Sequence, residues 1–248
     1  MHSSIIRTFK LFLDSYYPND VSLKVLEIGS QNINGGLRDF KRTNMSWFGV
    51  DLIEGPGVDK VINVGEKLPF PEETFDLVLA SSVFEHDIQF WNTFVEMVRV
   101  TKNHGATLLL MPSQGAYHRY PLDAFRFYPD ASLALEKWAL FSGLKTNLLE
   151  SFTTAPEDDF WADYVAIFSK MPFLHKDNLI GGKLMGENWI VDGQLIEETF
   201  QEYPIELRKI LKLEKEVEEL NLKLSSCEFP KFSRRIYIEK LLLKIFRQ

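Results

Sequence analysis

The 248-residue chain carries a formal net charge of −7, has a pI near 5.4, and is 45% apolar and 13% aromatic. A chain of this length and composition can bury one sizeable core, so we expect one main domain with a modest appendage. The acidic balance argues against nucleic acid as a partner. Cys227 is the only cysteine, which excludes an internal disulfide and cysteine-based metal sites.

The N-terminal run 5–13 is apolar but is interrupted by Arg7 and Lys10. It lacks a small-residue cleavage site and therefore predicts an amphipathic helix rather than a signal peptide. No stretch of the sequence has the length that a membrane span needs. We therefore expect a cytoplasmic protein without a membrane span.

Short apolar runs then alternate with helical patterns, which predicts an α/β protein with an open, mostly parallel seven-stranded sheet and helices on both faces. Apolar residues at helical spacing, and stop signals such as Gly105, set the helix boundaries. The expected strands are 24–28, 47–52, 60–64, 75–81, 106–111, 145–151 and 164–169. The expected helices are 36–43, 89–100 and 131–142.

This domain is expected to span residues 1–171. Residues 172–204 show no clear period and predict an irregular extension. Residues 205–248 predict a helical region whose apolar positions follow a coiled-coil-like spacing, namely Leu213, Val217, Leu220 and Leu224. Because about two heptads are too short to stand alone, this stripe is expected to pack on the domain or on a second subunit as a homodimer.

The last segment, 231–248, carries six basic residues against the single acid Glu239. Its basic residues alternate with apolar ones, so three interpretations stay open. The segment could lie on an anionic membrane surface, dock to a partner enzyme, or form a C-terminal helix that packs on the domain or dimerises.

The turn after the first strand is the most informative site. Glu27 ends the strand, Gly29 allows a sharp turn, and Ser30 is small enough for a ligand to approach the backbone closely. Gln31 and Ile33 stand where a dinucleotide-binding G-x-G-x-x-G turn would have glycines. This turn is therefore poorly suited to bind a pyrophosphate, whereas the ammonium group of a ligand with an amino acid end could pair with Glu27.

Asp51 closes the second strand, 22 residues after Gly29. At this placement a carboxylate can accept hydrogen bonds from ribose hydroxyls. The alternative is an ordinary turn aspartate. Together with Gly29, Asp51 favours a nucleoside site.

Four segments, LEIGSQNINGG, FGVDL, GEKLPFPEETFDLVLASSVFEH and GATLLLMPS, resemble in order and spacing the class I S-adenosylmethionine-dependent methyltransferase family. The resemblance covers about residues 20–170 and implies a Rossmann-like sheet of strand order 3-2-1-4-5-7-6, its last strand antiparallel. S-adenosylmethionine would bind across the carboxyl edge of this sheet.

The resemblance also implies roles for cofactor-binding residues. Glu27, Gly29 and Ser30 would hold the methionine end, Asp51 the ribose and Leu52 the adenine face. Val64 stands where many members have an aspartate for the adenine amino group, so a backbone N–H group, Asn63 or Glu66 would substitute. Val64, Gly65 and Glu66 would form the loop that reads the adenine edge, and Ser81, at the end of the fourth strand, would lie under the methionine portion.

The segment after the fifth strand, with the pattern HRYPLDxxRFYPD, resembles methyltransferases found with sugar-nucleotide and surface-polysaccharide enzymes. It implies that the acceptor is the hydroxyl of a small-molecule sugar or sugar nucleotide. Such a segment must pass over the cofactor crevice, where aromatic rings suit sugar faces and arginines suit phosphate or carboxylate. The candidate substrate-binding residues are Tyr117, Arg119, Tyr120 and Arg126. In the alternative, the segment is a packed lid in which Arg126 pairs with Asp123 or Asp130.

Methyl transfer to oxygen is an in-line displacement, so the acceptor's proton must be removed. His86 and His118 are the candidate bases, with Glu85 and Asp123 as orienting carboxylates. In the alternative, both are ordinary loop histidines and the family works by proximity alone. We find no motif for metal binding and expect no metal.

The favoured function is therefore methyl transfer from S-adenosylmethionine to a hydroxyl of a sugar, sugar nucleotide or glycan intermediate. A rival from another class is a non-catalytic methyltransferase-like scaffold in a glycan-assembly complex, which the thinned glycine turn and the coiled tail would suit. A nicotinamide-dependent reductase is a third alternative, opposed by the missing glycines.

Overall fold

The computed structural model describes residues 3–155, 161–171, 178–184, 187–197, 213 and 215–219. Contacts divide the chain into a unit of residues 1–200 and a unit of residues 201–248. In the second unit residue 213 and residues 215–219 are helical. Val217 of the predicted stripe is 42% exposed, whereas Leu220, Leu224 and the basic segment 231–248 lie outside the described residues.

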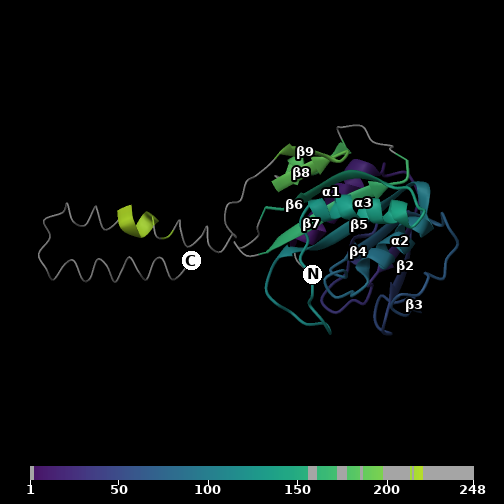
Figure 1. The fold of residues 1–248 in the computed structure, drawn as a ribbon. Helices are drawn as coiled ribbons and strands as arrows, with labels where there is room; N and C mark the ends of the chain where they lie inside the picture. The colour runs from purple at the N-terminus through teal and green to yellow at the C-terminus, as the bar shows by residue number, and fades with distance from the viewer. Residues whose placement is uncertain are drawn as a thin grey trace, which may run out of the picture. The chain divides into compact units, whose positions relative to one another are not determined.

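The first unit is built around a nine-stranded sheet of order β3-β2-β1-β4-β5-β7-β6-β8-β9 (Figure 1). Strands β1 to β5 pair in parallel, and all pairings from β5·β7 onward are antiparallel. The strands are β1 (Leu23–Ile28), β2 (Met45–Asp51), β3 (Lys60–Val61), β4 (Phe75–Ser81), β5 (Thr101–Gln114), β6 (Asn147–Thr153), β7 (Ala162–Ser169), β8 (Glu187–Val191) and β9 (Gln194–Glu197).

The order of the first seven strands confirms the arrangement implied by the resemblance, including the antiparallel β7 between β5 and β6. A dinucleotide-binding Rossmann sheet continues in parallel as 3-2-1-4-5-6, so this topology argues against the reductase alternative. The parallel strands leave their carboxyl ends at one edge, where open α/β sheets bind their ligands.

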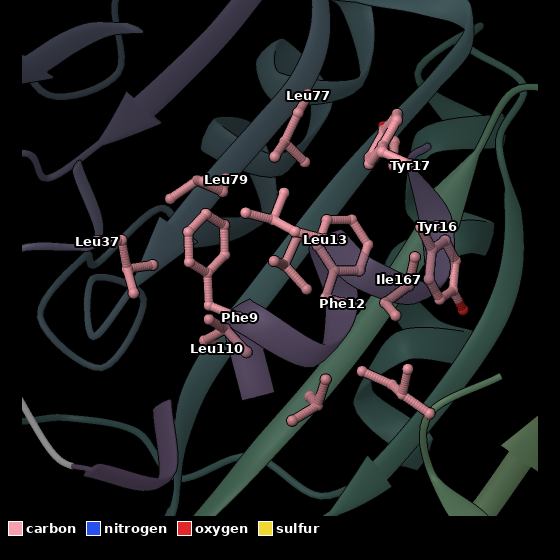
Figure 2. Close-up of a cluster of buried hydrophobic side chains, with 14 of the residues drawn as sticks. Phe9, Phe12, Leu13, Tyr16, Tyr17, Leu37, Leu77, Leu79, Leu110 and Ile167 are labelled. Carbon is pink, nitrogen blue, oxygen red and sulfur yellow. The ribbon is translucent and has the colours of Figure 1, made fainter. Parts of the chain in front are cut away.

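Helix α1 (Ser3–Tyr16) covers one face of the sheet, as the amphipathic pattern predicted. Its apolar stripe packs on alternate residues of the central strands, because every second side chain of a strand points to the same face of the sheet. Figure 2 shows the centre of this core, where Phe9, Phe12 and Leu13 of α1 meet Leu79 and Ile167. This packing fixes the strands that carry the site.

Helices α2 (Phe90–Val100) and α3 (Asp130–Phe141) cover the other face. Phe94 and Met97 of α2 are fully buried there, and Phe94 contacts Phe168 of β7 edge to face. Ordered layers on both faces hold the carboxyl ends of β1, β2 and β4 in fixed positions.

Three sequence expectations need correction. Residues 36–43 form only the short 3-10 helix η1 (Leu37–Phe40), so the crossover from β1 to β2 carries no full helix. The sheet has nine strands rather than seven and is mixed rather than mostly parallel. The extra strands β8 and β9 lie inside the region predicted to be irregular, where Asp192 and Gly193, both with positive φ, form a hairpin turn.

The first unit therefore extends past the predicted boundary at residue 171, because β8 pairs with β6. The 3-10 helix η3 (Gly182–Leu184) precedes this hairpin. Among the described residues, none of the helices is both long and apolar enough to cross a membrane.

Candidate active site

The turn after β1 folds back over the end of β2. The N–H groups of Gly29 and Ser30 both donate to the carbonyl of Val50, at 2.9 and 3.1 Å. Gly29 has a φ of +70°, a backbone conformation that residues other than glycine rarely adopt. A Cβ at Gly29 would also overlap the side chain of Val83, which follows β4. The turn thus requires glycine at this position.

Asp51 meets this turn directly. Its Oδ2 accepts a hydrogen bond from the N–H of Gln31 at 2.9 Å, and its Oδ1 accepts one from the N–H of Leu52 at 2.7 Å. A carboxylate has about four lone-pair positions, so two remain for further donors such as ribose hydroxyls. The turn and the acid, predicted to share one ligand, are therefore joined at the sheet edge.

Glu27 is buried at the end of β1 and lines a cavity of about 210 Å³. Trp47 donates its indole N–H to Glu27 Oε2 at 2.8 Å. Burial raises the pKa of Glu27 to about 7, and the bond from Trp47 opposes this rise. The remaining residues that line the cavity are Ser30, Asn32, Gly36, Arg38, Asp39 and Gly57.

This cavity carries charges of both signs, because Arg38 lines it together with the acids Glu27 and Asp39. Arg38 also pairs with Asp59, at 2.9 Å. The Ser30 hydroxyl is buried and has no hydrogen-bond partner among the described residues. An ammonium group suits Glu27 and a carboxylate suits Arg38. The residues present therefore fit the amino acid end of S-adenosylmethionine.

The side predicted to hold the adenine is open and apolar. Leu52 and Val64 are 49% and 50% exposed, which leaves their apolar side chains accessible to a ligand. Glu66 Oε2 accepts a hydrogen bond from Asn63 at 3.0 Å beside Gly65, which has φ of +76°. Ser81 ends β4, the neighbour of β1.

A larger hollow of about 460 Å³ lies at the opposite edge of the sheet. It is lined by the amino ends of β1, β2 and β4, among them Leu23, Met45 and Asp76. Ligands of open α/β sheets bind at the carboxyl edge, so the smaller cavity at Glu27 is the candidate cofactor site.

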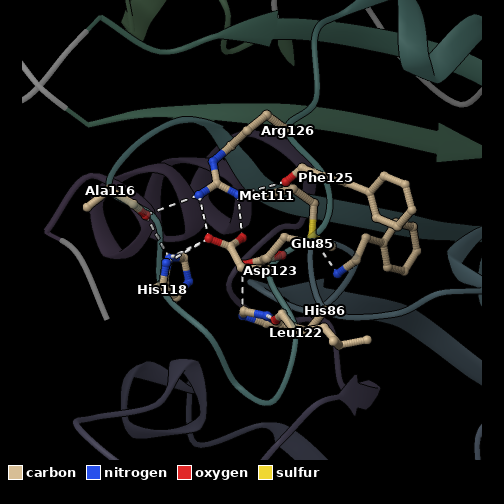
Figure 3. Close-up of polar contacts among 10 residues, drawn as sticks. Glu85, His86, Met111, Ala116, His118, Leu122, Asp123, Phe125 and Arg126 are labelled. Atoms are coloured by element: carbon tan, nitrogen blue, oxygen red, sulfur yellow. Dashed lines mark hydrogen bonds and ion pairs between the residues drawn. The ribbon is translucent and has the colours of Figure 1, made fainter.

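The four residues predicted to act on the acceptor's proton gather in one place, which we call the two-histidine cluster: Glu85, His86, His118 and Asp123 (Figure 3). The rings of His86 and His118 lie 5.1 Å apart and nearly perpendicular. His86 Nε2 is 3.7 Å from Glu85 Oε1, and His118 Nδ1 is 3.5 Å from Asp123 Oδ2. The chain segments after β4 and β5 thus meet here.

Asp123 is the anchor of this cluster. Arg126 donates to both of its oxygens, at 2.5 and 2.8 Å, and the N–H of His118 donates to Oδ2 at 2.7 Å. The bonds from Arg126 hold the pKa of Asp123 well below its usual range. Arg126 also donates to the carbonyls of Ala116 and Phe125. The structure thus favours the ion-pair alternative for Arg126 over a substrate clamp.

Burial shifts the pKa of two groups of the cluster, His86 and Glu85. It lowers the pKa of His86, which keeps this imidazole neutral and able to accept a proton near neutrality. It raises the pKa of Glu85, whose side chain is 1% exposed, to about 8. Without a cation beside it, Glu85 is therefore protonated at pH 7.

The predicted substrate segment touches the cofactor turn. Tyr120 donates its hydroxyl to Gln31 Oε1 at 3.1 Å, across 89 residues of sequence. Tyr117 is 72% exposed and its ring is free to face a ligand, whereas the Arg119 guanidinium donates to the carbonyl of Pro121. The segment thus lies against the turn that carries Gly29.

Sequence reasoning missed several residues of the site. Trp47 and Arg38 approach Glu27 from β2 and η1, and Val83 covers Gly29. Trp161 lies with its ring 6.0 Å from that of His118 and against Gly115. No local pattern marks these residues, because each reaches the site through the sheet topology.

Comparison with known proteins agrees with this geometry. Residues 13–109 match a family model described as a methyltransferase domain. No curated protein matches the sequence. Among solved structures, the chain is similar to Burkholderia thailandensis 1,6-didemethyltoxoflavin-N1-methyltransferase with bound 1,6-didemethyltoxoflavin and S-adenosylhomocysteine. The two share 13% identity over 68% of this chain and 79% of the other, with a TM-score of 0.51.

The chain is also similar to the [4+2]-cyclase SpnF, at 12% identity over 66% of this chain and 81% of the other, with a TM-score of 0.50. A methyltransferase from Aquifex aeolicus shares 12% identity over 67% of this chain and 98% of the other, with a TM-score of 0.44. At these identities the Burkholderia thailandensis methyltransferase and SpnF establish a common fold and no more. Together with the family match, they support an S-adenosylmethionine-dependent methyltransferase domain and S-adenosylmethionine as its cofactor.

Proposed function

We propose that this protein transfers a methyl group from S-adenosylmethionine to a hydroxyl of a sugar, sugar nucleotide or glycan intermediate. The observation that carries the proposal is the hydrogen bond from Tyr120 to Gln31, because it joins the candidate acceptor segment to the candidate cofactor turn. Exposed rings at Tyr117 and Tyr120 suit the apolar face of a sugar. Arg119 is the cation that would meet a phosphate or carboxylate of the acceptor.

Bound S-adenosylmethionine would supply an electrophilic methyl group on its sulfonium. Glu27 and Arg38 would hold its amino acid end, Asp51 its ribose, and Leu52 with Val64 its adenine. His86 or His118 would accept the proton of the acceptor hydroxyl as oxygen attacks the methyl carbon. Asp123, fixed by Arg126, would orient His118.

Calorimetric titration with S-adenosylhomocysteine tests the cofactor half of this proposal. We expect a saturable heat with the wild-type protein, and transfer of a labelled methyl group from S-adenosylmethionine to at least one member of a sugar-nucleotide panel. Absence of heat would contradict the proposal.

Two observations favour the scaffold alternative. Val83 covers Gly29, and both oxygens of Asp51 already accept backbone N–H groups. The [4+2]-cyclase SpnF, which is similar in fold, also illustrates that one fold hosts several chemistries. Heat with S-adenosylhomocysteine but no methyl transfer to any sugar nucleotide would favour this alternative.

A further inference from the structure

Three side chains of the two-histidine cluster present metal-ligating atoms to a common point. One carboxylate oxygen of Glu85 and one ring nitrogen each of His86 and His118 lie within 4.8 Å of one another. The histidines stand 32 positions apart in the sequence, on segments that follow different strands. This separation lies outside the short spacings of metal-binding motifs, which is why the sequence predicted no metal.

Both imidazoles are held by backbone carbonyls through the same ring nitrogen. His86 Nδ1 contacts the carbonyl of Leu122, and His118 Nδ1 lies 3.0 Å from the carbonyl of Ala116. A nitrogen that faces a carbonyl must carry the hydrogen, so Nε2 of each ring keeps its lone pair. Ligating histidines in metal sites are oriented in this way.

Glu85 supplies an independent observation. Its side chain is 1% exposed, and neither carboxylate oxygen has a hydrogen-bond partner among the described residues. A buried carboxyl group without donors is costly and rare in folded proteins. Arg126 does not relieve it, because this guanidinium bonds to Asp123 and to the carbonyls of Ala116 and Phe125. A cation between Glu85 and the histidines would compensate the buried carboxylate and bind the free lone pair of each ring.

We propose that Glu85, His86 and His118 bind a divalent transition-metal ion, with Zn²⁺ the best match to two imidazoles and one carboxylate. This ligand set occurs in catalytic zinc sites, where three protein ligands leave one coordination position open. The distance of 3.7 Å between His86 Nε2 and Glu85 Oε1 is close to the separation that zinc bonds of about 2 Å impose on two ligands. The three ligating atoms lie within 4.8 Å of one another, so a small shift of the partly exposed His118 ring would complete the site.

The role of the ion, unlike the site itself, rests on the proposed function. With the ion bound, the imidazoles are ligands rather than bases. The acceptor hydroxyl would take the open position, its pKa would fall, and its proton would pass to water while oxygen attacks the methyl carbon. The acceptor's oxygen gains the methyl group, and the sulfonium leaves as a neutral thioether.

Zinc stoichiometry of the full chain is the direct test. After dialysis against a chelator and then against buffer with Zn²⁺, we expect about one zinc ion per wild-type chain by atomic emission. Zinc should also raise the melting temperature, because only the folded chain holds the three ligands together. His118→Ala, at a partly exposed side chain, should lose the zinc and the shift. The matched control His104→Ala removes an exposed histidine outside the cluster and should retain both.

Glu85→Gln serves as the second variant, since it preserves size and removes the charge. We expect at least about a 10-fold loss of zinc affinity. No zinc on the wild-type chain, or equal zinc on His118→Ala, would overturn the proposed site. Zinc that depends on His118 without heat from S-adenosylhomocysteine would retain the site and contradict the methyltransferase proposal. Heat from S-adenosylhomocysteine without bound zinc would retain the methyltransferase proposal and contradict the zinc site.

Discussion

Two fully buried glutamates, Glu150 in β6 and Glu85 after β4, are surrounded in opposite ways. Glu150 accepts four hydrogen bonds, from Tyr16, Trp189 and the N–H groups of Ile180 and Gly181. Glu85 accepts none from the described residues. Burial of a carboxyl group is therefore not by itself a sign of function. Glu150 and Glu85 are equally buried and differ in the number of hydrogen-bond donors around them.

The donors of Glu150 come from α1, from the segment before η3 and from β8. This carboxylate thus ties the N-terminal helix and the added hairpin to the sheet. The neighbourhood of Glu85 supplies instead two imidazole lone pairs. The first region is complete without a ligand, whereas the second is completed by a cation, as we propose above.

The largest expected effect comes from Glu150→Gln. Each oxygen of Glu150 accepts two donors, so an amide nitrogen in either place would face two N–H or O–H groups. Loss of these bonds should lower the free energy of unfolding by roughly 4 kcal/mol. Urea denaturation measures this change. A loss below about 1 kcal/mol would show that the four bonds do not stabilise the fold.

Asp51 stands between these extremes, with two backbone donors and two lone-pair positions left. Asp51→Ala should weaken S-adenosylhomocysteine binding by about 100-fold, because two hydrogen bonds to a charged group are lost. Calorimetry measures this affinity. Glu54→Gln, a matched control at an exposed position three residues further on, should bind as the wild type does. Equal weakening in both variants would remove the ribose role from Asp51.

Glu85→Gln should give a smaller effect of opposite sign in the zinc-free protein. The pKa of Glu85 is about 8 in the fold and near 4.5 when unfolded, so the folded state binds more protons between these values. Stability therefore falls as the pH rises from about 4.5 to about 8 and is level above it. Removing the acid should add stability at pH 8 and little at pH 4.5, because only at the higher pH does the folded protein bury the charged carboxylate.

Unfolding free energies at both pH values, with chelator present, measure this prediction. Burial also raises the pKa of Glu27, to about 7, so the window from pH 7 to 8 isolates Glu85. If Glu85→Gln were less stable than the wild type at both pH values, the Glu85 carboxylate would have to be stabilised by hydrogen-bond donors other than those of the described residues.

The cofactor edge was more predictable from sequence than the acceptor cluster. Gly29 and Asp51 are local signals, because a sharp turn and the end of a strand each need a particular residue type. Glu85, His86 and His118 were predicted as acid–base candidates, but the orientation of the two imidazoles depends on the carbonyls of Leu122 and Ala116. No periodicity encodes where a loop carbonyl points.

The hairpin of β8 and β9 had a local signal that was overlooked. Asp192 and Gly193 are a typical two-residue turn between apolar runs, and both adopt positive φ. The pairing of β8 with β6 is different, because it joins segments that lie far apart in the sequence, as does the hydrogen bond from Trp189 to Glu150. Strand neighbours, unlike turns, are properties of the assembled sheet.

Trp47→Phe should give the smallest effect and would make Glu27 resemble Glu85. The substitution removes the indole N–H that Glu27 accepts at 2.8 Å and leaves the carboxylate without that donor. The pKa of Glu27 should then rise above about 7, and the variant should lose about 1 kcal/mol more at pH 8 than at pH 5. Trp189→Phe is the matched control, because Glu150 keeps three other donors. A pH-independent loss in both variants would mean that the indoles stabilise the fold only through packing.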